Sequence, residues 1–332
     1  MKTGDIGEMG LLSLIRDFTR MAKGAKLGFD EDASDIPLSD SHSVVLNIDT
    51  FVAGTDFLPG MTWAQAGRKT AVMALSDVLA KGGRPVASML SLCAPEDTPS
   101  DDVVEAVRGF SQYCLKSDVS FIGGDLGMAS EIVLSGVAVS IMNPRHMLKR
   151  GGAQKGDIIA VSRRFGLTSV AYQILLGGLQ TDDDALHKRA LSEAYRPELS
   201  LSLIPSLAEA GLLTSCMDSS DGLGKTLNTM SDQSGMMFRI DRLPSAAGVE
   251  IFARMHFMDE MKLVMQGGEE FIPVMTLPQN NWDAACDLAK GCGDSLFEIG
   301  KAVDSGKGVF YESPEGYVPV PADGYDNFRE WN

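Results

Sequence analysis

The stretch SVVLNID, residues 43–49, followed by WAQAGRKTAVMALSDVLAKGG, residues 63–83, decides how the N-terminal half of this chain is expected to fold. The first segment is apolar and β-branched, which is typical of a buried strand, and it ends at Asp49. The second is rich in Ala, Leu and Met and stops at Gly82 and Gly83. The pair therefore predicts a buried strand that is followed by a helix.

The segments that follow extend this pattern. They comprise three apolar runs and one helical segment, namely strands over 85–93, 120–125 and 131–142 and a helix over 100–116. The order strand, helix, strand, helix, strand, strand favours an α+β fold with a mixed or antiparallel sheet over a doubly wound parallel sheet. A further helix is expected before them, over Leu11–Met21, with Gly24 as its stop.

The segment NPRHMLKRGGAQKGD, residues 143–157, combines basic residues, a proline and paired glycines, and we interpret it as a linker. A second unit follows, with strands expected over 157–162, 214–218 and 236–240 and after 270, and helices over 168–177, 199–210 and 222–233. A chain of 332 residues exceeds the size at which a single core keeps growing. We therefore expect two domains, residues 1–142 and 143–332.

Composition excludes several classes of protein. The 29 Lys and Arg against 45 Asp and Glu give a net charge of −16, which repels nucleic acid. No apolar run approaches the roughly 20 residues of a membrane span, and the start MKTGDIGEMG lacks the apolar part of a signal peptide, so a cytoplasmic protein is expected. The five cysteines contain no C-x-x-C pair and the four histidines no H-E-x-x-H spacing. Reduced, mostly buried thiols are therefore expected, and a zinc site is not.

The sequence GLGKT, residues 222–226, is similar to the end of a phosphate-binding P-loop. The full pattern G-x-x-x-x-G-K-[ST] requires a glycine five places before its second glycine, and Ser219 occupies that place. Asp218 and Asp221 precede the helical run, so an approaching phosphate would meet negative charge first. We expect phosphate to be held here through a cation rather than through Lys225.

Several acids lie where a solvated surface position does not explain them. Asp49, Asp125 and Asp218 each end an apolar strand, and Asp77 lies inside an apolar helix, where an unpaired carboxylate is costly. We expect these acids to converge on hard cations, because magnesium prefers carboxylate, water and phosphate oxygens. A local alternative stays open, in which Asp221 caps a helix and Asp218 forms a turn.

Paired glycines precede two of the acidic segments, in GGD (123–125) and GGEE (267–270). Because glycine has no Cβ, these positions are expected to let the backbone approach a ligand closely. The two stretches are too short to indicate an internal duplication.

Seven stretches, in this order, resemble thiamine-monophosphate kinase over nearly the whole chain: DTFVAGTDFLPG (49–60), ALSDVLAKGGRP (74–85), FIGGDL (121–126), LKRGGAQKGD (148–157), MDSSDGL (217–223), QGGEEF (266–271) and DGYDNF (323–328). That family is related to aminoimidazole ribonucleotide synthetase and selenophosphate synthetase. The resemblance implies an N-terminal domain of ferredoxin-like α/β character that binds ATP and magnesium. It also implies a C-terminal α/β domain that completes the nucleotide and substrate site, and a homodimer whose N-terminal sheets join.

The resemblance further implies a reaction, transfer of the ATP γ-phosphoryl group to thiamine monophosphate with several magnesium ions. By motif, the magnesium ligands are Asp32, Asp49, Asp77, Asp125, Asp218 and Asp221, of which Asp125, Asp218 and Asp221 belong to the catalytic centre. The ATP contacts are Gly124, Asp125, Arg150 and Ser220, and the substrate contacts are Asp56, Glu269, Tyr325 and Phe328. The two aromatics would cover the cationic thiazolium, and a hydrophobic tuck of the C-terminus is their alternative role.

Some positions depart from the family pattern. Asp30 replaces the second glycine of the nucleotide-site stretch, where it adds charge and bulk, and Asn47 and Ile48 replace hydroxyl residues. Asp56 stands where the family has a histidine, and the segment YRPE (195–198) replaces a longer H-x-x-P-x-P-R motif. Two other functions therefore stay open: a kinase of another phosphate-bearing small molecule, and a catalytically weakened nucleotide-binding protein.

Overall fold

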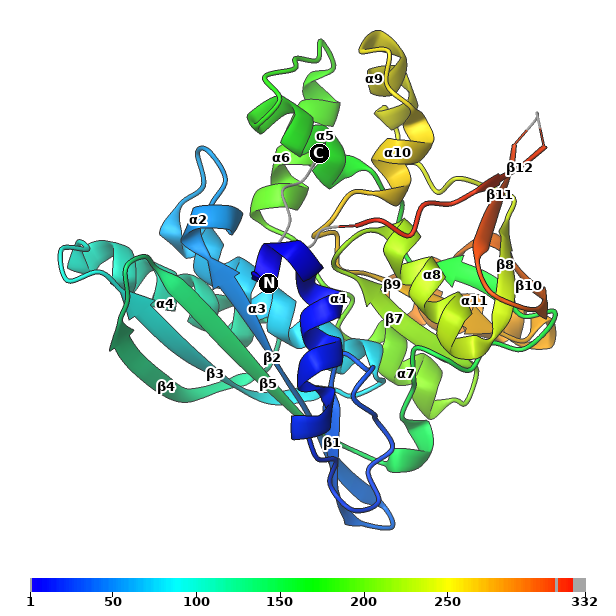
Figure 1. The fold of residues 1–332 in the computed structure, drawn as a ribbon, viewed down its shortest axis with the longest axis horizontal. Coiled ribbons are helices and arrows are strands. Elements are labelled where there is room, and N and C mark those ends of the chain that lie inside the picture. Colours follow the sequence, from blue (N-terminus) through cyan, green and yellow to red (C-terminus); the bar gives the residue numbers. More distant parts are fainter. Residues whose placement is uncertain (1, 314–315, 325–332) are drawn as a thin grey trace.

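The computed structural model describes residues 2–313 and 316–324. Two sheets, each with its own helices, lie side by side, the N-terminal one on the left and the C-terminal one on the right of Figure 1. The N-terminal helix α1 (Thr3–Ile15) lies in front of the junction between them, and the 3-10 turn η1 (Arg16–Phe18) follows it. None of the described helices is both long and apolar enough to cross a bilayer.

The N-terminal sheet has five strands in the order β1-β2-β5-β3-β4. Its strands are β1 (Ser34–Ser39), β2 (His42–Val52), β3 (Pro85–Ala94), β4 (Ser120–Met128) and β5 (Val133–Met142). Only β3 and β4 pair in parallel, and the other pairs are antiparallel, so the expected mixed sheet is confirmed. The sequence did not predict β1, nor the short helix α2 (Ala53–Asp56).

Helices α3 (Trp63–Ala80) and α4 (Ser100–Lys116) pack together on one face of this sheet. Alternate residues of β5 are therefore buried, as Leu134 and Ala138 show. The opposite face is open and apolar. Its exposed side chains include Ile48, Met89, Ile122 and Ile141.

The two helices cross at a pair of glycines. A Cβ added at Gly67 would lie 1.8 Å from the carbonyl oxygen of Ala106, and one at Gly109 would lie 1.9 Å from that of Ala64. Both values are far below any real contact, so the helices touch backbone to backbone at this point. The crossing therefore fixes how deeply α3 sits over the sheet.

The C-terminal sheet has seven strands in the order β12-β11-β8-β10-β6-β9-β7. They are β6 (Ile158–Val161), β7 (Ser215–Ser219), β8 (Met236–Ile240), β9 (Ile272–Leu277), β10 (Phe297–Ser305), β11 (Val309–Ser313) and β12 (Gly316–Pro319). The helices are α5 (Leu167–Leu175), α6 (Asp184–Tyr195), α7 (Leu203–Glu209), α8 (Leu223–Ser234), α9 (Val249–Met255), α10 (Glu260–Met265) and α11 (Trp282–Gly291). Two short 3-10 turns, η2 (Pro144–His146) and η3 (Gln279–Asn281), complete the elements.

The central strands of this sheet are buried on both faces. Ile158 of β6 belongs to a core with α7 and α11, whereas its neighbour Ile159 belongs to the main core with α5 and α8. Every residue of β6 and β9 is buried, which explains why these strands are continuous apolar runs in the sequence. All five cysteines are free thiols, although only Cys114 and Cys216 are buried.

We predict that Gly109→Ala destabilises the protein by about 3 kcal/mol, because the new methyl group must push two helix backbones apart. Gly291→Ala is the matched control: Gly291 ends helix α11 at an exposed position and has no heavy atom within 4 Å of an added Cβ. That change is expected to be neutral or slightly stabilising. Urea unfolding measures both, and equal stabilities of the two variants would contradict the close crossing.

Candidate functional site

A cavity of about 290 Å³ lies between the two sheets. It is lined from the N-terminal half by Glu8, Asp32, Ile48, Asp49, Thr50, Thr55, Asp56, Leu58, Met73 and Asp77, and from the C-terminal half by Arg150, Tyr172, Leu176, Ser220, Asp221, Gly268, Glu269 and Phe271. We call the part around Asp32 and Asp77, with the buried Asp218 beside them, the acidic end, and the part around Asp56, Tyr172 and Glu269 the α5 end. Both domains are thus needed to form the cavity.

Three carboxylates meet at the acidic end. Asp32, Asp77 and Asp218 each offer an oxygen, and these oxygens all lie within 4.8 Å of one another. Asp218, at the end of β7, is only 2% exposed, and its Oδ2 accepts a hydrogen bond of 2.6 Å from Ser76 Oγ. Its Oδ1 is buried without a hydrogen-bond partner among the described residues. A buried, unpartnered carboxylate oxygen beside two more acids is an arrangement that suits a divalent cation.

Burial and repulsion from neighbouring carboxylates raise the pKa values of two acids at this end, Asp77 and Asp49. Burial raises the pKa of Asp77 well above its usual range, and Asp218 and Asp49 raise it further. Asn47 partly offsets this by donating to Asp77 Oδ2 at 2.7 Å. Burial, followed by repulsion from neighbouring acids, likewise raises the pKa of Asp49 to about 7. In the absence of a cation these groups therefore hold protons that ordinary aspartates release.

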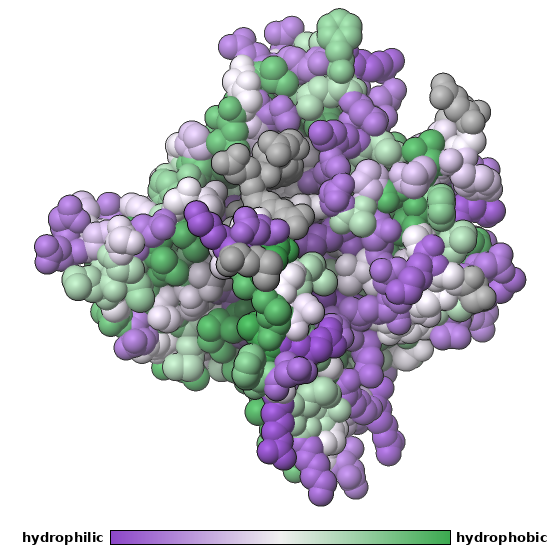
Figure 2. All heavy atoms as spheres, viewed as in Figure 1, coloured by the Kyte–Doolittle hydropathy of each residue, from purple (hydrophilic) through white to green (hydrophobic). Residues whose placement is uncertain are grey.

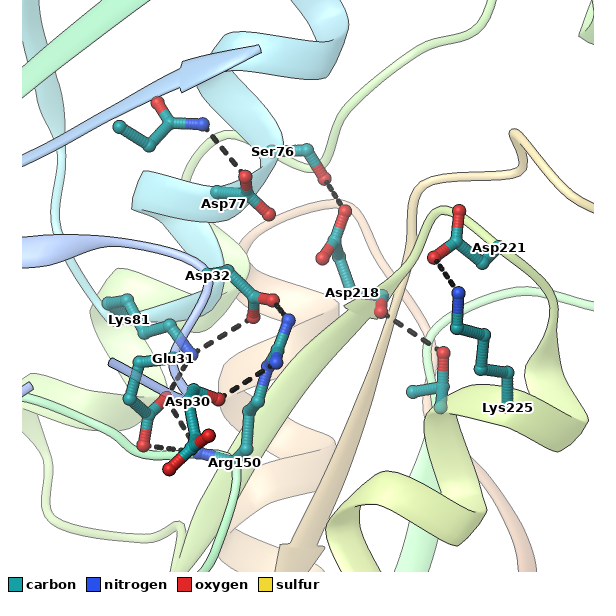
Figure 3. A network of polar contacts seen from close by, with 12 residues as sticks. Asp30, Glu31, Asp32, Ser76, Asp77, Lys81, Arg150, Asp218, Asp221 and Lys225 are labelled. Carbon is teal, nitrogen blue, oxygen red and sulfur yellow. Dashed lines mark hydrogen bonds and ion pairs between the residues drawn. The ribbon is translucent and has the colours of Figure 1, made fainter. Parts of the chain in front are cut away.

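Two cationic side chains, those of Lys81 and Arg150, form ion pairs with Asp32 (Figure 3). Lys81, fully buried at the end of α3, places its Nζ 2.6 Å from Glu31 Oε2 and 3.1 Å from Asp32 Oδ2. The Arg150 guanidinium pairs with Asp32, and it donates to the Asp30 carbonyl at 2.9 Å. Burial lowers the pKa of Arg150, and nearby carboxylates, Glu31 foremost, oppose that change. Sequence reasoning missed Lys81 and Glu31.

The Asp30 side chain does not fill the space that we expected it to crowd. It is more than half exposed and pairs with Arg16, whose Nη1 lies 3.1 Å from Asp30 Oδ2. The expectation of added charge and bulk against a ligand is therefore wrong for this side chain, because it points to Arg16 and not into the cavity. Only the Asp30 carbonyl contributes, as an acceptor for Arg150 and for Gln233.

The GLGKT segment forms the start of α8 and does not form a phosphate loop. Lys225 Nζ lies 2.7 Å from Asp221 Oδ2 and 4.0 Å from Glu8 Oε2, so its charge is already balanced. A Cβ at Gly224 would lie 2.7 Å from the Pro321 carbonyl, so this glycine serves packing. The alternative roles for two acids are also wrong: Gly222 is the N-cap residue of α8, and Asp218 lies in a strand.

A second set of charged groups forms the α5 end. Glu269 pairs with Lys69 Nζ at 2.5 Å and accepts a hydrogen bond from the Tyr172 hydroxyl. Lys69 is 1% exposed and lies in the middle of α3, where no pattern in the sequence marked it as buried. Asp56 lies close by; burial raises its pKa, and Glu269 adds to the rise. Leu58, Met73, Leu176 and Phe271 supply apolar walls.

A single helix serves both ends of the cavity. Lys69 and Met73 of α3 act at the α5 end, and Ser76, Asp77 and Lys81 at its C-terminal end act at the acidic end. The helix begins with a complete capping box, in which the side chains of Thr62 and Gln65 bond each other's backbone N–H. Packing on the sheet and against α4 holds the rest of it.

The structure does not bring every expected site residue into the cavity. Asp125 is exposed on the edge strand β4, where it pairs in register with Ser91, and three strand spacings, about 14 Å, separate it from Thr50. Gly124 lies against the neighbouring strand, because a Cβ there would meet the Leu90 carbonyl at 1.7 Å. Tyr325 and Phe328 lie outside the described residues.

Comparisons with known proteins agree with one another. The family model "AIR synthase related protein, N-terminal domain" matches residues 30–142, and its C-terminal counterpart matches residues 154–312. Thiamine-monophosphate kinase of Nitrosopumilus maritimus is 30% identical over 86% of this chain and 90% of its own, and that of Pyrobaculum calidifontis is 33% identical over 79% and 82%.

Solved structures of related proteins share the fold of this chain over most of its length. A protein of Thermus thermophilus has a TM-score of 0.85 with 29% identity, covering 96% of this chain and all (100%) of that one. AaThiL, solved in complex with AMPPCP and TMP, has a TM-score of 0.81 over 96% of this chain and 98% of its own. Because its identity is 22%, that second likeness concerns the fold alone.

We predict that the metal-free protein loses stability as the pH rises from about 4 towards 8. Asp49, Asp77 and Asp56 have raised pKa values in the folded state, so folding takes up protons in this range. Their contribution is complete below the unfolded pKa, near 4, and is lost as the pH rises through about 7, the folded value of Asp49. Magnesium is expected to restore stability at pH 8 and to do little at pH 4.5, as read from thermal unfolding.

Asp77→Asn should weaken both the loss of stability at high pH and the stabilisation by magnesium, because it removes one repelling charge from the carboxylate cluster. The variant is expected to unfold at a higher temperature than the unmodified protein at pH 8 without metal, and to gain less from magnesium. Asp287→Asn, at an exposed acid paired with Lys290, is the control and should change neither. An unchanged magnesium response in Asp77→Asn would remove this residue from the cation site.

Proposed function

The chain belongs to the AIR synthase related family and, within it, to the thiamine-monophosphate kinases, and from this premise we propose that it transfers the ATP γ-phosphoryl group to thiamine monophosphate. The observation that carries the proposal is the unpartnered Asp218 Oδ1 within the carboxylate cluster. An acidic protein can receive the polyphosphate of ATP only where cations reverse the local field, and this cluster is such a place.

We propose that Asp32, Asp77 and Asp218 hold magnesium, with Asp49 and Asp221 beside them. The donor set fits, because all are carboxylates and one oxygen is buried and unsatisfied. Bound magnesium would neutralise phosphate oxygens and favour in-line transfer. Lys81 and Arg150 hold Asp32 in place, and Ser76 holds Asp218, so the ligands are oriented before any ion arrives.

The accepting group needs little activation. A phosphate monoester is already anionic near neutral pH, so no side chain has to remove a proton from it. The protein's own contribution is therefore to position the acceptor and to keep its charge compensated. Ser220 and Arg150 line the cavity on the C-terminal side and are proposed ATP contacts.

The α5 end suits the rings of thiamine. Lys69 already pairs with Glu269, so Asp56 is the carboxylate that favours a cation, and the apolar walls formed by Leu58, Met73 and Phe271 favour a flat ring. The thiazolium has both properties. An aspartate at position 56, which departs from the family pattern, therefore favours a cationic acceptor over an uncharged phosphorylated one.

We also propose a homodimer formed through the open face of the N-terminal sheet. Ile48, Met89, Ile122 and Ile141 project from this face, and Figure 2 shows an apolar area over the same part of the surface. We propose that a second copy of the chain covers this face, because a contiguous group of exposed apolar side chains is costly in water.

Such a dimer would also give Asp125 a role. A polar row crosses the open face in register, from Thr50 at the cavity through Ser135 and Ser91 to Asp125 at the edge. We propose that Asp125, with Gly124, serves the site of the partner copy. Residues 1–142 would then form the dimerising domain and residues 143–332 the domain that closes the site. A reaction that consumes ATP is consistent with a cytoplasmic protein.

We predict that Asp218→Asn lowers turnover by two to three orders of magnitude, of the size found when a preorganised charge stabiliser is lost. Incubation with ATP, magnesium and thiamine monophosphate, followed by chromatography for thiamine diphosphate, measures it. Asp287→Asn serves as the control and should retain full turnover. If the unmodified protein binds ATP and forms no thiamine diphosphate, the proposed acceptor is wrong.

We predict that Met89→Glu converts the dimer into a monomer, since it buries a charge in the proposed interface. Light scattering after gel filtration reports the mass. Val104→Glu is the matched control, because Val104 is an exposed apolar residue of α4, outside the open face, and this change should leave the mass unaltered. A monomeric mass for the unmodified protein at micromolar concentration would refute this interface.

A further inference from the structure

Glu270 is a carboxylate that the cavity does not use. It is 0% exposed, although both of its neighbours, Glu269 and Phe271, line the cavity. Glu269 thus faces the site, Phe271 borders the cavity from the main core, and Glu270 lies wholly in the interior. A fully buried acid requires partners, and those of Glu270 lie on another element.

The partners are the first amides of α5. Glu270 Oε1 accepts from Gly166 N at 2.9 Å, from Leu167 N at 3.0 Å and from Thr168 N at 3.5 Å, and Oε2 accepts from Gly166 N at 3.2 Å. Gly166 is the N-cap residue, with φ of 100°, and has no side chain to cap the helix. Glu270 therefore acts as the cap from a position 104 residues away in sequence.

The backbone around Glu270 is held in an uncommon conformation. Glu269 and Phe271 have φ values of 62° and 49°, in the left-handed region that residues with a side chain rarely adopt. Their amides donate to the carbonyls of Ser220 at 2.5 Å and Ser219 at 2.9 Å, directly after Asp218. Such a conformation persists only where the surroundings enforce it. The buried Glu270 side chain between them is the third attachment point of this turn.

The turn at residues 269–271 is also connected by hydrogen bonds and an ion pair to helix α3 of the N-terminal domain. Arg163 donates from Nη2 to the Glu270 carbonyl at 3.3 Å and to the Glu198 carbonyl at 2.9 Å, and from Nη1 to Glu193 at 2.8 Å. The Glu198 carboxylate in turn pairs with Arg68 of α3 at 2.6 Å. The YRPE segment that departs from the family pattern is therefore part of this connection.

We propose that Glu270 is a positioning residue for the acceptor end of the cavity. Through the cap it fixes α5, which carries Tyr172 and is followed by Leu176, and through the turn it fixes Glu269, which accepts from Tyr172. It touches no ligand itself. The inference rests on the proposed function in one respect, namely that the α5 end holds thiamine monophosphate and the acidic end holds ATP.

The test compares Glu270→Ala with Glu270→Gln. The alanine variant leaves the amides of residues 166–168 without an acceptor, whereas the glutamine oxygen can still accept from them. We expect Glu270→Ala to raise the KM for thiamine monophosphate at least tenfold and to change the KM for ATP less than twofold. Glu270→Gln is expected to keep the KM for thiamine monophosphate close to that of the unmodified protein.

Met275→Ala is the matched control for loss of stability. Met275 is fully buried in β9 and follows the turn by four residues in the sequence. It belongs to the core with α7 and α11 rather than to the core with α5. If this variant raises the KM for thiamine monophosphate as selectively as Glu270→Ala does, the change in KM reflects a general loss of stability, and the proposal is overturned. Equal changes in both KM values for Glu270→Ala overturn it as well.

Hydrogen–deuterium exchange gives a readout that needs no substrate. We expect faster exchange over residues 166–176 in Glu270→Ala, unchanged exchange in α8, and partial recovery in Glu270→Gln. Unchanged exchange over residues 166–176 overturns the positioning role even if catalysis is altered. If the unmodified protein makes no thiamine diphosphate, the proposed function fails, and the exchange result still decides the role of Glu270.

Discussion

Electrostatic repulsion among the carboxylates at the domain junction is the constraint on which this structure depends. Asp32, Asp77 and Asp218 come from a loop, a helix and a strand, and the fold forces them within 4.8 Å of one another. Such a cluster is tolerated because its surroundings are arranged around it. Lys81 and Arg150 compensate one side, and hydrogen bonds from Ser76 and Asn47 reach the other. Asp218 Oδ1 still has no hydrogen-bond partner among the described residues, and the proposed cation site rests on it.

The sequence predicted the fold best where long apolar runs form buried elements, and it missed the short helices α9 and α10 although each buries three residues. Helix α4 and strand β8 have the predicted bounds, and the mixed sheet follows from the order of the elements. Weakly apolar segments were missed. Helix α6 buries only three of its residues, and β12 is exposed along its whole length, so neither carries a clear period. The helix expected over Leu11–Met21 lies earlier in the chain, because α1 covers Thr3–Ile15, and α1 is interrupted by a kink at Gly7, whose φ is 66°.

The site was predictable in its acids and not in its cations. An aspartate inside an apolar helix or at the end of an apolar strand conflicts with its surroundings, and that conflict marked Asp77 and Asp218. Lys69 and Lys81 look in the sequence like ordinary helix-surface lysines, and only the packing of α3 shows that both are buried. Glu270 was hidden for a similar reason: its partners at 166–168 come together with it only in the folded chain. Asp125 shows the converse: it was expected to end its strand, but β4 continues to Met128, and in a single copy Asp125 lies far from the cavity.

Helix α3 carries groups for both ends of the cavity on one rigid rod. Lys69 and Asp77 are eight residues apart, which corresponds to about 12 Å along a helix axis. In the proposed function, the length of this helix segment therefore sets the distance between the ring of the acceptor and the phosphates at the acidic end. One residue inserted between Lys69 and Asp77 would shift Asp77 by about 1.5 Å along the helix axis and rotate it by about 100°. A change of side-chain rotamer could not compensate for such a rotation. Changes in chain length are compatible with this enzyme in its loops and not within this helix.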